Sequence, residues 1–156
     1  MLSVFLKESY IFFTHQKSFG ELINYGLTLP EFAFTDSIRH DLWELIQERL
    51  KIFPSTIDHH NTLLHLFHPQ ITKTMLSVFI NQENLPVSDK DKEYFNVLFL
   101  LLTQPQHLKR YSKLKGRLIR VLEDETINYR IRQTDHPSIV HHILTDAEVK
   151  LLDLPY

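Results

Sequence analysis

The sequence predicts a three-layer α/β/α sandwich with a small mixed sheet, in the order strand, two helices, three strands and three helices. The first observation behind this fold class is an uninterrupted apolar run, Val97–Leu102, which is typical of a central strand covered on both faces. The second is that segments with apolar residues at helical spacing lie before and after the strand-like runs. The third is that no repeat and no Pro-, Gly- or Ser-rich linker divides the chain. We therefore expect a single domain over residues 1–156.

The composition excludes several classes of protein. Of the 156 residues, 43% are apolar and 23% are charged, which is typical of a globular chain and not of a disordered one. No apolar run approaches the ~20 residues of a membrane helix, and Lys7 and Glu8 interrupt the apolar N-terminal stretch, which argues against a signal peptide. The absence of cysteine excludes disulfides, thiolate metal sites and thiol nucleophiles. The net charge of -2 predicts no general attraction to nucleic acid.

The first half of the chain predicts one strand followed by two helices. Ser9–Phe13 is a short aromatic and β-branched run, which is typical of a strand. Ser18–Leu27 carries apolar residues at helical spacing. A longer helix begins near Thr35, where residues suited to an N-cap precede an apolar stripe that continues to Leu50.

The second half predicts three strands and then three helices. The strands are Thr62–Phe67, Thr74–Ile80 and Phe95–Leu102, with a charged loop at Glu83–Glu93. The helices are His107–Leu122, Asp124–Gln133 and one that begins at Pro137, a residue suited to a first helical turn.

Histidine is frequent, and four histidines and an aspartate fall within Asp58–His68. Imidazole and carboxylate groups are ligands of zinc and other transition metals. On a strand, however, His65 and His68 point to opposite faces, and the adjacent His59 and His60 also diverge. The spacing therefore argues against a metal site, and we expect none.

Two basic residues outside this segment indicate a different chemistry. Arg49 ends the long helix just before the segment, and His107 begins a later helix, where backbone N–H groups and the helix dipole favour an anion. A histidine that faces both has the surroundings of a phosphohistidine, because phosphoryl transfer requires mainly positioning and neutralisation of the phosphoryl oxygens. A structural alternative stays open, in which Arg49 only caps its helix and His107 only begins one.

Several segments are similar to a known family. The stronger similarities are Val97–Leu102, His107–Leu108, Ile119–Ile127 and Ile143–Glu148, and the looser ones are Leu6–Phe13 and Lys17–Ile23. Together these segments resemble the type-2 enzyme IIA domain of the phosphoenolpyruvate-dependent sugar phosphotransferase system, in its mannitol, fructose and nitrogen-regulatory branches. The resemblance implies a cytoplasmic phosphoryl-carrier or regulatory protein.

The resemblance assigns roles to three residues. With the strand Leu76–Ile80 in register, His65 takes the family's phosphorylated position and Arg49 falls on the arginine of the motif. His107 matches the second active-site histidine, which is followed by leucine. The resemblance therefore implies that His65 accepts phosphate, Arg49 neutralises its oxygens and His107 positions it. We expect the three side chains to converge on one cleft in which His65 is open to solvent.

The family's motif is only partly present. Leu50 stands in place of its glutamate, Leu64 in place of its proline, and Asp58 and His60 in place of glycines. His68, which precedes a proline, offers a rival position two or three residues out of register. Two functions therefore stay open: a diverged enzyme IIA domain that still takes phosphate, and an unphosphorylated regulatory binding module.

The resemblance also implies partners. An HPr-type histidine phosphocarrier would supply the phosphoryl group, and an enzyme IIB domain or a regulatory target would receive it or respond to it. It implies neither a bound cofactor nor a metal.

A basic helix face has no explanation in the family. Along the helix that begins at His107, one face carries Lys109, Lys113, Arg117 and Arg120, joined by Arg110 and Lys115. A solvated basic face is the simpler interpretation. The functional alternative is a docking surface for an acidic partner.

Overall fold

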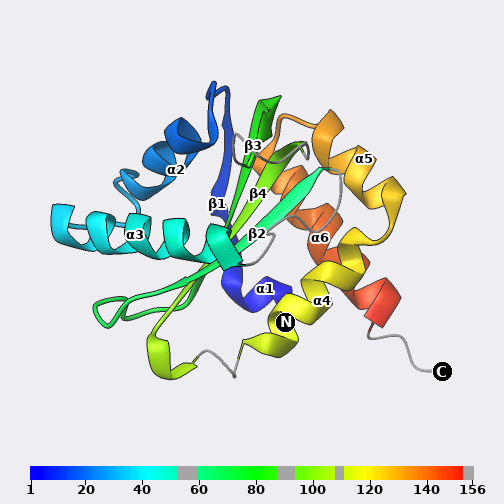
Figure 1. Ribbon diagram of the computed structural model, residues 1–156. Helices are drawn as coiled ribbons and strands as arrows, with labels where there is room; N and C mark the ends of the chain where they lie inside the picture. Colours follow the sequence, from blue (N-terminus) through cyan, green and yellow to red (C-terminus); the bar gives the residue numbers. More distant parts are fainter. Residues whose placement is uncertain (53–59, 88–93, 108–110, 153–156) are drawn as a thin grey trace.

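Four strands form a mixed sheet, and helices cover both of its faces (Figure 1). The computed structural model describes residues 1–52, 60–87, 94–107 and 111–152. The strands are β1 (Leu6–Thr14), β2 (Asn61–Phe67), β3 (Met75–Pro86) and β4 (Tyr94–Thr103). The helices are α1 (Leu2–Phe5), α2 (Phe19–Leu27), α3 (Asp36–Ile52), α4 (Ser112–Leu122), α5 (Glu125–Gln133) and α6 (Pro137–Leu152), with a short 3-10 helix, η1 (Pro105–His107). The predicted three-layer fold class and order are confirmed, and α1 is an addition to them.

The strands run in the order β1-β3-β4-β2 across the sheet. β1 is parallel to β3, β2 is parallel to β4, and the two inner strands, β3 and β4, are antiparallel. β4 therefore has a strand on each side and helices over each face, which explains its uninterrupted apolar run. β2 forms one edge of the sheet and places His65 opposite Leu101 of β4.

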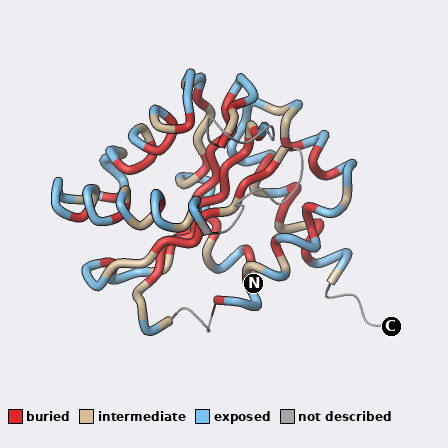
Figure 2. The backbone as a smooth tube through the Cα atoms, viewed as in Figure 1, coloured by how far each residue is buried: buried red, intermediate tan, exposed pale blue. Residues whose placement is uncertain are grey.

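Two apolar cores lie on the two faces of the sheet. One core joins the sheet to α2 and α3, and the other joins it to α1, α4, α5 and α6. Successive residues of β4 alternate between them: Leu98 and Leu100 belong to the first core, and Phe99 belongs to the second. Figure 2 shows the consequence, with the buried residues concentrated along the central strands.

Local signals explain where several helices begin. The Ser18 side chain accepts a hydrogen bond from the backbone N–H of Glu21, and the Asp124 side chain accepts one from the N–H of Thr126. Both contacts satisfy N–H groups that have no partner inside the helix. α6 begins at Pro137, as its sequence predicted.

Tertiary pairing lengthens two strands beyond their predicted bounds. β1 begins at Leu6 instead of Ser9 and is paired with Leu76 of β3 there. β3 continues to Pro86, so the prediction of a charged loop from residue 83 is wrong for its first residues. The reason is that Leu85 pairs with Phe95 and is itself only 2% exposed. Residues 88–93 of that loop lie outside the described residues.

One buried carboxylate ties α6 to α4 and to the N-terminal segment. Glu148 is 2% exposed and accepts hydrogen bonds from Arg117 Nε at 2.7 Å and from the backbone N–H of Leu2 at 2.8 Å. The amino group of Met1 also donates to it, at 2.7 Å. Burial raises the pKa of Glu148, but these hydrogen bonds outweigh burial and lower it below the ordinary value.

Within the described part of the chain, no helix combines the length and apolar character needed to cross a lipid bilayer.

Candidate functional site

His65 lies on β2 and faces the layer that contains α4, α5 and α6. Its neighbours Leu64 and Leu66 belong to the core beneath α2 and α3, so His65 points to the opposite side. His65 Nε2 lies 2.8 Å from the hydroxyl of Thr103 on β4. The residue is only 5% exposed. The expectation of a solvent-open His65 is therefore wrong in this structure, because helices cover both faces of the strand that carries it.

The His65 ring is uncharged at neutral pH. Burial lowers its pKa, and the charges of Lys115 and Arg49 lower it further, from 6.5 to about 4. A neutral imidazole keeps one ring nitrogen with a free electron pair and one that carries a proton. The Thr103 hydroxyl is compatible with either tautomer, since it both donates and accepts hydrogen bonds.

Arg49 reaches the site from the last turn of α3. Its guanidinium carbon lies 5.2 Å from the centre of the Phe67 ring, in a cation–π contact. Phe67 follows His65 by two residues and shares its face of β2. The structure thus brings Arg49 and His65 together, and the predicted role of Arg49 toward phosphate stays a prediction.

Lys115 was predicted as part of the basic face of its helix and not as a neighbour of His65. It is half-buried on α4 and follows Leu114, a residue of the core on that face of the sheet. Burial lowers the pKa of Lys115, and the nearby charge of Arg49 lowers it as well. Its place beside the apolar stripe of α4 was visible in the sequence, but only the fold shows that its charge lowers the pKa of His65.

His107 ends η1 and contacts a different set of side chains. Its ring stacks on Tyr111, with centroids 6.3 Å apart. Both residues line a cavity of about 260 Å³ together with Lys73, Gln104 and residues of α1. Neither Arg49 nor His65 lines this cavity. The predicted role of His107 in positioning phosphate stays a prediction.

His68, the rival position, lies at the end of β2 and turns to the opposite layer. Its Nε2 lies 2.8 Å from a carboxylate oxygen of Asp41 on α3, and its Nδ1 accepts the backbone N–H of Gln70 at 3.1 Å. The side chain is 12% exposed. His65 and His68 therefore diverge, as their spacing predicted. Among the described residues, no three histidine, aspartate or glutamate side chains are close enough to hold a metal ion.

Two of the residues that depart from the family's motif are core residues here. Leu64 is 3% exposed within the core beneath α2 and α3, and Leu50 packs against the same core. A glutamate or a proline would lose this apolar contact. His60 precedes β2, and Asp58 lies outside the described residues, as do Ser55 and Ile57 of the predicted motif.

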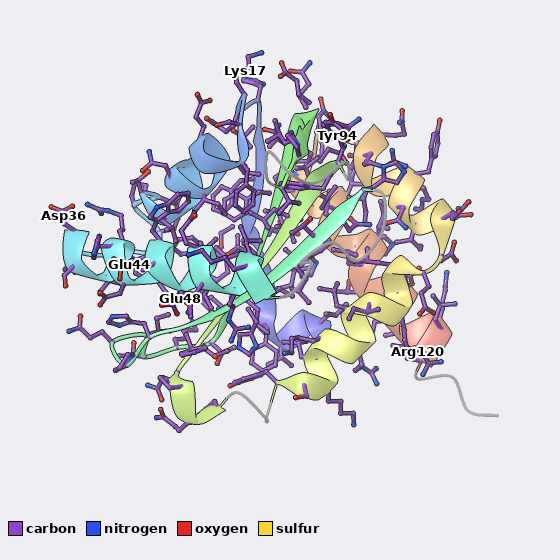
Figure 3. The ribbon with its side chains drawn as sticks, in the orientation of Figure 1. Lys17, Asp36, Glu44, Glu48, Tyr94 and Arg120 are labelled. Atoms are coloured by element: carbon purple, nitrogen blue, oxygen red, sulfur yellow. The ribbon has the colours of Figure 1, made fainter. Side chains whose placement is uncertain are left out.

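The predicted basic face of α4 is not a continuous surface. Arg117 is half-buried and bound to Glu148, so it does not project with the exposed Lys113. Lys109 lies outside the described residues. Arg120 is exposed and points away from the sheet (Figure 3). The prediction failed for Arg117 because an internal carboxylate on α6 neutralises it.

Comparison with known proteins identifies the fold. The sequence matches no protein-family model and no curated protein. Among solved structures, the chain is similar to the nitrogen regulatory protein IIA-Ntr of Neisseria meningitidis. The TM-score is 0.78 at 16% identity, over 92% of this chain and 98% of that one. It is also similar to a putative PTS IIA domain of Streptococcus pyogenes, with a TM-score of 0.71 at 15% identity over 96% and 94% of the two chains.

A third similar structure is IIA mannitol of Escherichia coli, with a TM-score of 0.60 at 15% identity, over 89% of this chain and 98% of that one. These similarities extend over both layers of helices and the sheet between them, because they cover nearly the whole of each chain. The chain therefore has the fold of the type-2 enzyme IIA domains of the phosphotransferase system.

Proposed function

We propose that this chain is a phosphocarrier or regulatory protein of the enzyme IIA type, in which His65 accepts a phosphoryl group from an HPr-type histidine phosphocarrier. The observation that carries the proposal is the neutral His65 ring, whose pKa is lowered by burial and by the charges of Lys115 and Arg49. Because the pKa of His65 is lowered to about 4, a ring nitrogen has a free electron pair at neutral pH. A protonated ring has none and cannot attack phosphorus.

The transfer is a displacement between two imidazole rings. The new N–P bond to His65 forms as the N–P bond of the donor breaks, and the donor's ring leaves with the electron pair of that bond. Arg49 is the residue that would balance the charge of the phosphoryl oxygens. We propose that His107 lies against the phosphoryl group in the complex, as the resemblance implies.

The burial of His65 sets a requirement on this reaction. The donor's phosphorus must come into line with a ring nitrogen, and a ring that is 5% exposed does not allow that approach. Transfer therefore requires that the complex with the donor uncovers His65.

The same burial favours a second candidate function, a regulatory binding module that takes no phosphate. In that case the hydrogen bond between His65 and Thr103 is a permanent part of the core. Partners would then recognise the surface of the domain and not a phosphohistidine.

The decisive experiment is incubation with phosphoenolpyruvate, enzyme I and HPr, followed by mass spectrometry of the intact protein. We expect an acid-labile increase of one phosphoryl group, lost in His65→Ala and retained in His68→Ala. His68 is the matched control, because both of its ring nitrogens already contact Asp41 and Gln70. Uptake lost in His68→Ala instead would show that the register is wrong. No uptake in the wild-type protein would favour the binding module.

The onward partner is proposed by analogy with one solved complex. A structure of enzyme IIA mannitol with phosphorylated enzyme IIB mannitol of Escherichia coli matches 90% of this chain at a TM-score of 0.60 and 14% identity. We propose that an enzyme IIB-type domain, or a regulatory target that binds the same face, is the partner of this chain.

A further inference from the structure

The hydroxyl of Thr103 is the only hydrogen-bond partner of the His65 ring among the described residues. The strands that carry the two residues, β2 and β4, lie side by side (Figure 1). His65 is paired with Leu101, and Thr103 follows Leu101 by two residues, so the contact crosses the two strands diagonally on one face of the sheet. The atoms that meet are His65 Nε2 and Thr103 Oγ1, which are 2.8 Å apart.

The burial of Thr103 decides which residue donates the proton of this hydrogen bond. Thr103 is 0% exposed, and its hydroxyl bonds to no other group in the described part of the chain. If the ring donated, the O–H of Thr103 would be left with neither an acceptor nor water, which is costly. If the hydroxyl donates, the ring proton lies on Nδ1, which is not among the buried polar atoms that lack a partner. The hydroxyl is therefore the donor.

This direction of the hydrogen bond turns the reactive electron pair of His65 inward. The pair on Nε2 points at Thr103, which no solvent reaches. Phosphorus must approach a ring nitrogen along its electron pair, and Nδ1 has no free pair while it carries the proton. The neutral state of the ring, with its pKa lowered to about 4, is a condition for this contact, because a protonated Nε2 could not accept a hydrogen bond.

We propose that Thr103 is a positioning residue that holds the His65 ring in an unreactive orientation, and that opening of this hydrogen bond is a step of phosphoryl uptake. This role rests on the proposed function, because it acts through transfer to His65. In the complex with the donor, the ring would turn about its side-chain bonds, so that Nε2 leaves Thr103 and faces the phosphorus. A donor that binds this open orientation more tightly than the closed one shifts the protein toward it.

The unmodified protein tests the orientation without any donor. Nitrogen NMR of the histidine rings at pH 7 reports which ring nitrogen carries the proton. We expect the proton of His65 on Nδ1 in the wild type and in Thr103→Ser, which keeps the hydroxyl. Thr103→Val removes the hydroxyl at nearly the same volume, and part of the proton population should then move to Nε2. Thr62→Val is the matched control, because Thr62 of β2 is also 0% exposed but its hydroxyl has no partner.

The rate of uptake from HPr tests the opening step. At limiting HPr, we expect Thr103→Val to take up phosphate about two- to tenfold faster than the wild type, the factor for one hydrogen bond between uncharged groups. Thr103→Ser and Thr62→Val should match the wild type. A purely structural role of Thr103 makes the opposite prediction, because loss of a buried contact would then leave the rate unchanged or lower it.

Two results would overturn the inference. A His65 proton on Nε2 in the wild-type protein would show that the ring is the donor, and uptake by Thr103→Val that is no faster than the wild type would show that Thr103 does not restrain transfer. Failure of the proposed function looks different. If no variant takes a phosphoryl group but the His65 proton lies on Nδ1 and moves in Thr103→Val, the orientation assigned to the ring is supported, and the relay and the opening step are rejected.

Discussion

Acid should destabilise this protein through His65 by an amount that the structure defines. The pKa of His65 is lowered to about 4 in the folded chain, against 6.5 when the ring is in water. The unfolded state therefore binds a proton more tightly than the folded state does. The stability that the neutral ring confers is complete above pH 6.5 and is lost as the pH falls toward 4. At about 1.4 kcal/mol for each pH unit, the total loss is about 3 kcal/mol, of which about 2 kcal/mol falls between pH 7 and pH 5.

The measurement is a comparison of wild-type protein with His65→Gln by urea unfolding at pH 7, 6 and 5. Glutamine keeps a polar group near Thr103 but does not titrate, so acid effects on the carboxylates cancel in the difference. We expect the wild type to lose about 2 kcal/mol relative to the variant over this range. His142→Gln, at an exposed position of α6, controls for the general effect of removing a histidine. A difference between wild type and His65→Gln that does not change with pH would refute the reasoning, because it would mean that the two cations and burial do not act on this ring.

Two further predictions concern the scaffold. Phe79 is fully buried and stacks on Phe12, with ring centroids 5.2 Å apart. Phe79→Ala should lower the free energy of unfolding by about 3–5 kcal/mol. A loss below about 1 kcal/mol would mean that this core is loosely packed. Glu148→Gln removes the charge that holds Arg117, and should cost about 2–3 kcal/mol, measured as a fall in Tm. Asp146→Asn is the control, because the Asp146 carboxylate is 37% exposed and pairs with a lysine at the surface. An equal fall in Tm for Glu148→Gln and Asp146→Asn would contradict the special role of the buried Glu148 carboxylate.

The elements of the fold were largely predictable because their signals are local. Each signal affects only residues a few positions away in the sequence. Examples are the apolar run in β4, the caps at Ser18 and Asp124, and Pro137 at the start of α6. Strand ends were less predictable. Leu85 belongs to β3 only because Phe95 pairs with it, and such a contact depends on how two distant segments meet.

The sequence predicted which kinds of residue form the candidate site, but it did not predict every residue that belongs to it. Arg49 and His65 could be named because each stands at a recognisable place, the end of a helix and a histidine-rich strand. Lys115 was assigned only to the basic face of its helix, because it is one of several basic residues there. Only the packing of α4 half-buries it and brings its charge to bear on His65. His65 was expected at the surface, and the helices over both faces of its strand bury it.

The sequence by itself determined most of the helices and strands, although not α1 or the full length of β3, and that at least one strand must be buried on both faces. Periodicity and capping carry this information, since they depend on neighbours along the chain. Only the tertiary structure decided which charges meet. It paired Arg117 with Glu148, brought the charge of Lys115 near enough to lower the pKa of His65, and covered the His65 ring. The physical reason is that the energy of a charge depends on its burial and on its distance from other charges, and both are properties of the packed chain.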